Sequence, residues 1–396
     1  MNRIKKYFRI FIGIILLAII ITGVIYLINP SYIENIAYNW FSPKITIEEK
    51  YAGQIVVETP EVYELMQIAY SLTPTFQKDP NLIHKGTEYY EDFENHFMEF
   101  KDHELIDKLN EYIKSDYLKS QLMIRLLSLN YKIDNQGKLK NNGLLSYNPI
   151  LAKLAKSNFF INRENIELIE DFIAKSEFKE FYKQNRPYYE KLINNYNELC
   201  DFHKVKNWLN NKFSTTHHSY RIIFSPLTGG LHNTMSLKNK NQPGEQIFMF
   251  VSAPSESIDS LNNNELEIKA SQATREVFTE IDHQYVNPLT DKYISEMKSS
   301  MSDYKEWSNQ KNGLYTSKYK TFNEYMTWGV FNLYALDTYS KRNIDTIIEI
   351  QSDFMREKRD FIKFPEFNRE LLRIYKQKEK PKVKKLYKPM LNWMKE

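Results

Sequence analysis

The chain has 396 residues, a formal net charge of +4 at neutral pH and a single cysteine, Cys200. Its 28 tyrosines and 24 phenylalanines can fill one large or two moderate cores, which excludes an intrinsically disordered protein. The small net charge, with no recognisable nucleic-acid-binding motif, argues against a nucleic-acid partner. Cys200 cannot form an internal disulfide and is expected in the core. Glycine and proline are scarce and apolar residues recur at helical spacing, so we predict a mainly α protein with a small β-sheet (α+β).

The first 29 residues predict a membrane anchor. Residues 10–28 are uncharged and almost wholly apolar, close to the roughly 20 residues that a helix needs to cross a bilayer. Basic residues precede them, which favours a cytoplasmic N-terminus and an extracytoplasmic main domain, periplasmic or at the cell surface. A cleavable signal peptide is the alternative, but Ile28-Asn29-Pro30 offers no small-residue cleavage site. We therefore predict a single-pass membrane protein that contacts the lipid bilayer through residues 10–28.

A linker, residues 30–58, leads to a helical region, residues 59–214. Thr59-Pro60 supplies a capping hydroxyl and a proline at the first helical position, as at a helix start. The charged residues of the region alternate with apolar ones, as on solvated helix faces, and form no motif of a functional site. Apolar spacing predicts further helices at residues 89–100, 104–113, 117–129, 150–155, 165–174 and 188–202.

The pattern changes near residue 215, where we place the start of a region that extends to residue 375. Residues 220–225 and 246–252 are rich in Ile, Phe, Val and Met and are bounded by glycine and proline, so they predict two strands. We expect these strands to pair as a hairpin with a long loop. A helix from about residue 265 to 286 follows, and Asn287-Pro288 is expected to end it.

The predicted helix carries Glu280-x-x-His283 on its polar face, together with Glu276 and Thr279. In the zinc-peptidase pattern H-E-x-x-H, two histidines one turn apart bind one zinc ion and the glutamate activates a water molecule. Thr279 stands where the first histidine would be, and a neutral hydroxyl is a poor zinc ligand. On spacing alone, a solvated helix face with His283 near the helix C-terminus is the simpler explanation.

Three segments are more specific than this spacing. They are residues 279–288 (TEIDHQYVNP), residues 224–232 (FSPLTGGLH) and residues 321–330 (TFNEYMTWGV). In order, they resemble the H-E-[FYI]-x-H-x-[FY]-V-N-P block, the strand and S-P-L…G-G turn, and the later glutamate-bearing helix of one family. That family consists of exported bacterial domains of unknown function, regarded as gluzincin-like zinc metallopeptidases. The resemblance extends over roughly residues 59–350 and implies a gluzincin-like architecture.

The resemblance also implies a role for each matching residue. Glu280 falls at the general base, His283 at the second zinc ligand and Glu324 at the third ligand. Thr279 departs from the pattern at the first ligand. For Glu324 the sequence itself offers another role, because Thr321 and Glu324 form the pattern of a capping box at a helix start.

A zinc site that has lost one imidazole has three outcomes. A catalytic zinc needs three protein ligands, so a site with two is expected to be mostly empty. Another residue can supply the donor, with His232 as the first candidate and the pair His217-His218 as the second, although surface loop positions are the simpler explanation for these histidines. Alternatively, Glu280 itself becomes a ligand in a Glu-x-x-His283 pair. In the third outcome no metal binds and the cleft serves as a binding surface.

Three functions are consistent with the sequence. We slightly favour a membrane-anchored extracytoplasmic metallopeptidase-like protein with a degenerate zinc site that binds a peptide or an envelope protein, because Thr279 is hard to reconcile with a working peptidase. The alternatives are an active metal-dependent peptidase, with Glu280 as base and a non-standard ligand set, and a structural envelope protein. At the C-terminus, lysine-rich residues 376–396 are interrupted by prolines, so we expect a solvated basic tail rather than a segment on an anionic membrane.

Overall fold

The computed structural model describes residues 43–396, apart from 116, 147–160, 162, 216–218, 231, 242, 255–257, 259 and 310–314. The predicted anchor at residues 10–28 and the predicted helix at 150–155 lie outside the described residues, as does the pair His217-His218. Among the residues that are described, no helix is both long enough and apolar enough to cross a membrane.

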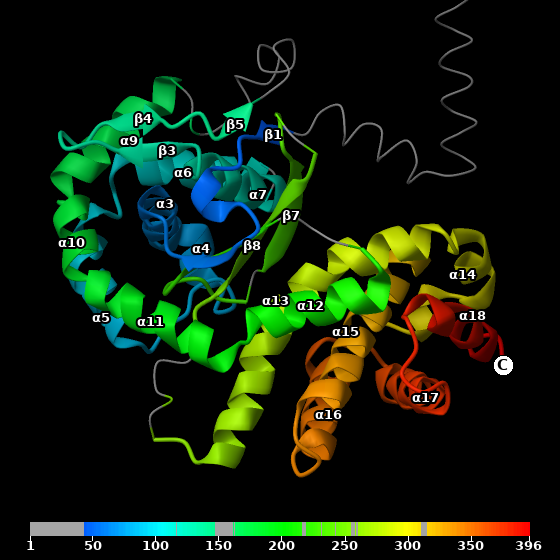
Figure 1. The fold of residues 1–396 in the computed structure, drawn as a ribbon. Coiled ribbons are helices and arrows are strands. Elements are labelled where there is room, and N and C mark those ends of the chain that lie inside the picture. Colours follow the sequence, from blue (N-terminus) through cyan, green and yellow to red (C-terminus); the bar gives the residue numbers. More distant parts are fainter. Residues whose placement is uncertain are drawn as a thin grey trace, which may run out of the picture.

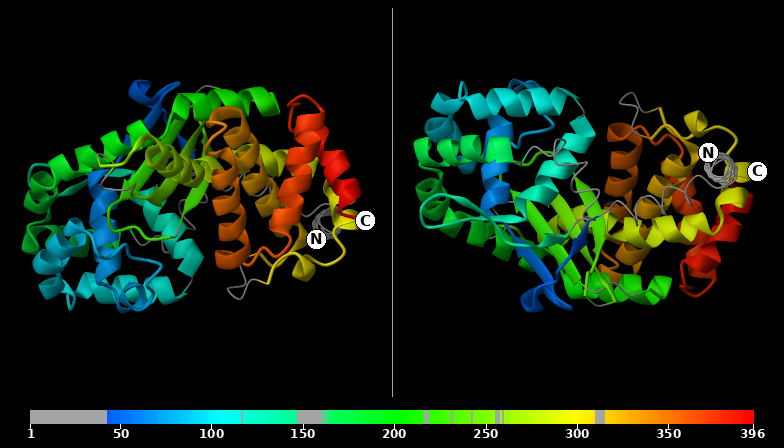
Figure 2. Two further views of the ribbon diagram at one scale, coloured as in Figure 1. Left: turned by 90° about the horizontal axis from the view of Figure 1, so that it is seen from below. Right: turned by 90° about the horizontal axis from the view of Figure 1, so that it is seen from above.

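A four-stranded sheet lies between two groups of helices (Figures 1 and 2). Its strands, in order across the sheet, are β2 (Ile55–Glu58), β6 (Ser219–Ser225), β8 (Glu245–Ser252) and β7 (Asn233–Lys238). β2, β6 and β8 are parallel, and β7 lies antiparallel to β8 at the edge. The two predicted strands are thus present, but the predicted hairpin between them is wrong. Their connection contains β7, which forms the hairpin with β8 and leaves β6 to pair with β8 in parallel.

The sheet separates two hydrophobic cores because successive side chains of a strand point to opposite faces. In β6, Ile222 packs among the C-terminal helices, whereas the next residue, Ile223, packs among the N-terminal helices. In β8, Met249 and Phe250 divide in the same way. All four side chains are 0% exposed, so these strands are buried on both faces. Burial on both faces explains why both segments read as continuous apolar runs rather than as alternating patterns.

The N-terminal helices form one side of the molecule in Figure 1. They are α3 (Glu61–Leu72), α4 (Pro74–Lys78), α5 (Glu88–Phe97), α6 (Glu104–Ser115), α7 (Tyr117–Ser128), α9 (Arg163–Lys175), α10 (Phe178–Gln184) and α11 (Arg186–Leu199). The next helix, α12 (Phe202–Phe213), packs against α13 (Asn263–Asp291), and its buried residues belong to the core on the other side of the sheet. α3 is buried along its whole length from Val62 to Leu72, so it is the central helix of this group. Two small antiparallel pairs of strands accompany these helices: β1 (Lys44–Ile45) with β5 (Leu145–Ser146), and β3 (Tyr131–Ile133) with β4 (Leu139–Asn141).

The C-terminal helices cover the other face of the sheet. They are α13 (Asn263–Asp291), α14 (Ile294–Ser300), α15 (Lys318–Thr338), α16 (Ile344–Asp353), α17 (Phe364–Gln377) and α18 (Lys384–Trp393), with a π-helical turn, η5 (Phe354–Lys358), after α16. α13 packs against β8, α11 and α15, and α15 in turn packs against α16 and α17. α13 therefore links the sheet to the C-terminal helices.

Two expectations for this region differ from the structure. The predicted helix 265–286 is longer and runs through Pro288 to Asp291, because Leu289 is buried and Thr290 hydrogen-bonds the Tyr387 hydroxyl at 3.0 Å, which hold its last turn in place. The expected solvated tail is largely a helix, α18, that packs on α14 and α17. Its apolar residues are buried in the core: Leu386, Tyr387, Met390 and Leu391.

Candidate functional site

Helix α13 begins at a complete capping box. The Asn262 side chain accepts from the backbone N–H groups of Asn264 and Glu265, and the Glu265 carboxylate accepts from the backbone of Asn262. Further along the helix, Glu280 and His283 lie one turn apart on the side toward α15. This arrangement brings His283 into contact with α15, a helix that is distant in sequence.

His283 and Glu324 form the centre of the site. The His283 Nε2 lies 3.2 Å from the Glu324 Oε1, and the Thr327 hydroxyl lies 3.4 Å from the Nδ1 on the other side of the ring. Glu324 is in the second turn of α15 and does not cap it, because the cap is the Ser317 side chain, which accepts from the Lys320 N–H. The capping-box interpretation of Glu324 is therefore wrong, and its side chain points to His283 instead.

Arg359 also binds Glu324, and sequence reasoning missed it. Its Nη2 lies 3.1 Å from the Glu324 Oε2, and the same nitrogen donates to the Tyr315 hydroxyl at 2.7 Å. The guanidinium stacks on the Trp328 ring, 4.7 Å from its centre, and the Trp328 indole N–H donates to the same Oε2 at 3.2 Å. Each oxygen of this carboxylate thus has a cationic neighbour. We refer to Glu280, His283, Glu324 and Arg359 as the charged cluster.

These contacts set the protonation states of the buried pair. Burial alone would raise the pKa of Glu324, but the Arg359 guanidinium and the bond from His283 outweigh it and hold that pKa below its usual value. Burial would likewise lower the pKa of His283, but the bond to the Glu324 carboxylate and its negative charge raise it. Both shifts favour a carboxylate beside an imidazolium.

Glu280 has a different environment. Burial raises its pKa to about 7, and the negative charge of Glu324 acts in the same direction, against the opposing effects of His283 and Arg359. The side chain is half-buried, so water reaches it. A carboxyl group whose pKa lies near neutrality, at the edge of a cluster of charges, has the property that a general acid or base requires.

The Thr279 hydroxyl and the His232 ring, the proposed substitute donor, both bond to groups outside the charged cluster. The Thr279 hydroxyl donates to the backbone carbonyl of Arg275 at 2.9 Å, and the residue is 5% exposed. The His232 Nε2 lies 3.0 Å from the Ser252 Oγ, which in turn donates to the Glu276 Oε2 at 3.1 Å. Burial, together with nearby guanidiniums, lowers the pKa of His232 to about 3, so its ring is neutral. The structure therefore joins His232 to Ser252 and Glu276 rather than to His283 and Glu324.

His283 and Glu324 lie at a spacing that resembles that of two zinc ligands. With bonds of the usual length and tetrahedral angles, a histidine nitrogen and a carboxylate oxygen on one zinc lie about 3.4 Å apart. The 3.2 Å between His283 and Glu324 is close to that spacing. A third donor is missing, however, and the described residues contain no group of three or more His, Cys, Asp or Glu side chains that could hold a metal ion. Of the expected ligands, His283 and Glu324 lie together, and the Oε2 of Glu324 is already bound to Arg359.

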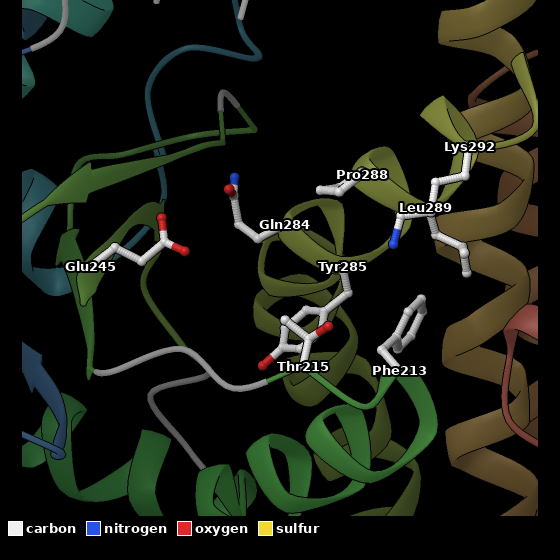
Figure 3. A pocket seen from close by; sticks show the side chains of 8 residues that line it. All are labelled: Phe213, Thr215, Glu245, Gln284, Tyr285, Pro288, Leu289 and Lys292. Atoms are coloured by element: carbon white, nitrogen blue, oxygen red, sulfur yellow. The ribbon is translucent and has the colours of Figure 1, made fainter. Parts of the chain in front are cut away.

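A pocket of about 270 Å³ lies further along α13 (Figure 3). Gln284 and Pro288 on its wall follow Glu280 by one and two helical turns, about 6 and 12 Å along the axis. Figure 3 shows Glu245 and Lys292 on opposite sides of the pocket, with Gln284 between them. The remaining walls come from the end of α12 and from α13: Phe213, Thr215, Tyr285 and Leu289.

The fold is of α+β class. The helix that carries E-x-x-H, α13, packs on the sheet, and a polar site lies between it and α15, which supplies Glu324. The sequence profile of a domain of unknown function, DUF4932, matches residues 57–331, and the chain belongs to that family. Searches of curated proteins and of solved structures gave no match. Arg359 lies outside the matched residues, whereas Glu280, His283 and Glu324 lie inside them.

Proposed function

We propose that this protein is a non-catalytic, metallopeptidase-like protein that binds a peptide or protein segment at the charged cluster and works without zinc. The observation that carries the proposal is the position of Glu324, whose two oxygens are held at once by His283 and Arg359. The Thr279 hydroxyl, at the place of the first ligand, is bonded to backbone. The cation that balances Glu324 is thus a guanidinium from the chain itself.

The positions of the charged cluster and the pocket along α13 suit a peptide that contacts both. The pocket beside Gln284 and Pro288 begins one turn beyond Glu280, so a ligand that meets both the charged cluster and the pocket spans about 6–12 Å. An extended peptide covers that distance with two to four residues, at about 3.3 Å each. The opposite charges of Glu245 and Lys292 suit a polar side chain in the pocket. We place this binding outside the cytoplasm, with residues 10–28 as anchor, on the basis of the apolar run and the basic residues before it.

The second candidate is a metal-dependent peptidase or other hydrolase. It is favoured by the zinc-like spacing of His283 and Glu324 and by the pKa of Glu280, about 7. In that case His283 and Glu324 would hold the metal with one further donor, and Glu280 would take a proton from water. The missing third ligand is the reason that we place this candidate second.

Zinc content of the purified full-length chain tests both candidates. We expect no stoichiometric zinc in the wild type. Thr279→His supplies the third ligand, and Thr279→His combined with Arg359→Met also frees Glu324 from its guanidinium, so zinc content should rise in that order toward one per chain. Lys269→His, at an exposed position of the same helix, is the control for an added imidazole and should bind none.

Two results would contradict these assignments. Stoichiometric zinc in the wild type, lost in His283→Ala, would establish the metal-dependent candidate in place of the non-catalytic one. If the folded double variant binds no zinc, the interpretation of Thr279, His283 and Glu324 as a degenerate ligand set is wrong. Circular dichroism of each variant shows whether it is folded.

A further inference from the structure

We propose that the charged cluster recognises a carboxylate group on its peptide ligand, with Arg359 as the principal donor. The inference rests on the proposed function, since it names the chemical group that a bound peptide presents. It begins with what the cluster shows to solvent. The side chains of Arg359 and His283 are 23% and 21% exposed, whereas that of Glu324 is 5% exposed. A ligand that approaches the cluster therefore meets the Arg359 guanidinium and the His283 ring, with the carboxylate beneath them.

The guanidinium of Arg359 is held in place before any ligand arrives. It lies on the Trp328 ring, is bonded to Glu324, and donates to the Tyr315 hydroxyl. The side chain of a free arginine loses much rotational freedom when it binds a ligand, so fixing it in advance removes part of that cost. A planar guanidinium in a fixed orientation matches the two oxygens of a carboxylate.

Two other arginines lie near the cluster. The Arg275 guanidinium lies 5.5 Å from the centre of the Trp328 ring and 4.6 Å from that of Phe354, and its Nη2 is 3.8 Å from the Glu276 Oε1. Arg275, Arg125 and Arg359 all lie close enough to His232 to lower its pKa, in addition to the effect of burial. These guanidiniums keep their charge at every physiological pH, whereas the charge of Glu280, whose pKa is about 7, changes around neutrality.

The same geometry favours a carboxylate over a phosphate. Glu324 stays beneath the two donors, and Glu280 lies beside them as an acidic group. A ligand with one negative charge meets less repulsion from these two residues than a ligand with two. A carboxylate on a peptide comes either from its C-terminus or from an aspartate or glutamate side chain, and the chemistry of recognition is common to both.

A pair of peptide libraries tests the inference with the full-length chain. Degenerate decapeptides are synthesised as C-terminal acids and as C-terminal amides, each with and without acidic residues, and binders are selected by mass spectrometry. Dissociation constants of selected peptides are then measured by fluorescence anisotropy. Removal of the recognised carboxylate should weaken binding about 10- to 100-fold, as expected for a hydrogen bond between charged groups. If binding requires the C-terminal acid rather than the amide, the recognised carboxylate is the C-terminus. If binding requires acidic residues in the peptide, the recognised carboxylate is a side chain.

Variants at Arg359 locate the effect. Arg359→Met should abolish the preference for the carboxylate, and Arg359→Lys should keep only part of it, because an ammonium lacks the planar fork. Arg356→Met is the matched control in the same segment, because Arg356 is 46% exposed and binds Asp353 and Glu357 rather than Glu324. It should leave the preference unchanged. If Arg359→Met fails to fold, the comparison of acids with amides and Arg359→Lys still decide the question.

The outcomes separate the two proposals. Peptides that bind equally well with and without a carboxylate would overturn the inference and leave peptide binding intact. A preference that persists in Arg359→Met would overturn the role of Arg359. If no member of either library binds, the proposed peptide-binding function fails, and the inference fails with it.

Discussion

Replacement of Arg359 by methionine is the most direct test of the charged cluster. The substitution removes the guanidinium from the Glu324 Oε2, 3.1 Å away, and leaves His283 on the other oxygen. Removing one partner of a buried ion pair typically costs 3–5 kcal/mol because a charge is left without compensation. Since His283 remains, we expect a loss near the lower end, about 3 kcal/mol in the free energy of unfolding.

A double-mutant cycle separates the charge pair from the packing of the arginine. In Glu324→Gln the buried charge is absent, so Arg359→Met should cost only about 1 kcal/mol there, mainly for the lost stacking on Trp328. The expected coupling energy between Arg359 and Glu324 is therefore about 2 kcal/mol. The four proteins are compared by urea unfolding, followed by far-ultraviolet circular dichroism and tryptophan fluorescence.

The exposed Arg356 of η5 provides the control for this cycle. Arg356→Met removes an equally long cationic side chain whose partners, Asp353 and Glu357, are exposed, and it should cost no more than about 0.5 kcal/mol. A cost for Arg359→Met no larger than this, or a coupling energy below about 0.5 kcal/mol, would refute the view that Arg359 is the counter-ion of Glu324.

Two further predictions concern Glu64 and the pair Gly229-Gly230. Glu64 is fully buried, and burial raises its pKa to about 7 although the Tyr89 hydroxyl donates to it at 2.7 Å. Between pH 4.5 and 7 the folded protein therefore holds a proton on Glu64 that the unfolded chain releases. The free energy of unfolding should fall by up to about 3 kcal/mol as the pH rises through that window. Urea midpoints at pH 5 and pH 8 should show this fall in the wild type and in the exposed control Glu111→Gln, and an undiminished fall in Glu64→Gln would contradict the assignment. Gly229→Ala should cost about 1–3 kcal/mol, because its new Cβ would lie 2.3 Å from the backbone oxygen of Asn81, whereas Gly230→Ala, with the same oxygen at 3.7 Å, should cost little. Thermal unfolding of the pair checks this, and equal melting temperatures would show that the chain relaxes around Gly229.

The sequence predicted those features that depend on local spacing. The helical character of residues 59–214 and the E-x-x-H helix follow from apolar periodicity, and the two central strands follow from short apolar runs bounded by glycine and proline. The structure confirms a mainly helical α+β fold. The resemblance to the family located His283 and Glu324, and the structure brings these two side chains together. The spacing of one helix could not have predicted this contact, since Glu324 comes from another helix.

Features that depend on distant contacts could not be predicted in the same way. Two apolar strands separated by a loop do not reveal whether they pair in parallel, and the sequence of β7 is too polar to be recognised as a strand. Arg359 is one of many basic residues, and nothing in the sequence shows that the π-helical turn before it directs it to Glu324. The lysines of α18 suggested a solvated tail because its buried residues are spread along a short segment that includes Pro389.

The central sheet has a consequence for the integrity of the chain. Neighbouring residues such as Ile222 and Ile223 pack into two different hydrophobic cores, so the strands belong to both cores at once. A fragment that starts at residue 215 would keep β6, β7 and β8 but lose the N-terminal helices that cover one face of the sheet. Neither half can then be expected to survive as an independent product, and a cut between β2 and β6 should send both pieces into aggregates rather than release a smaller folded protein.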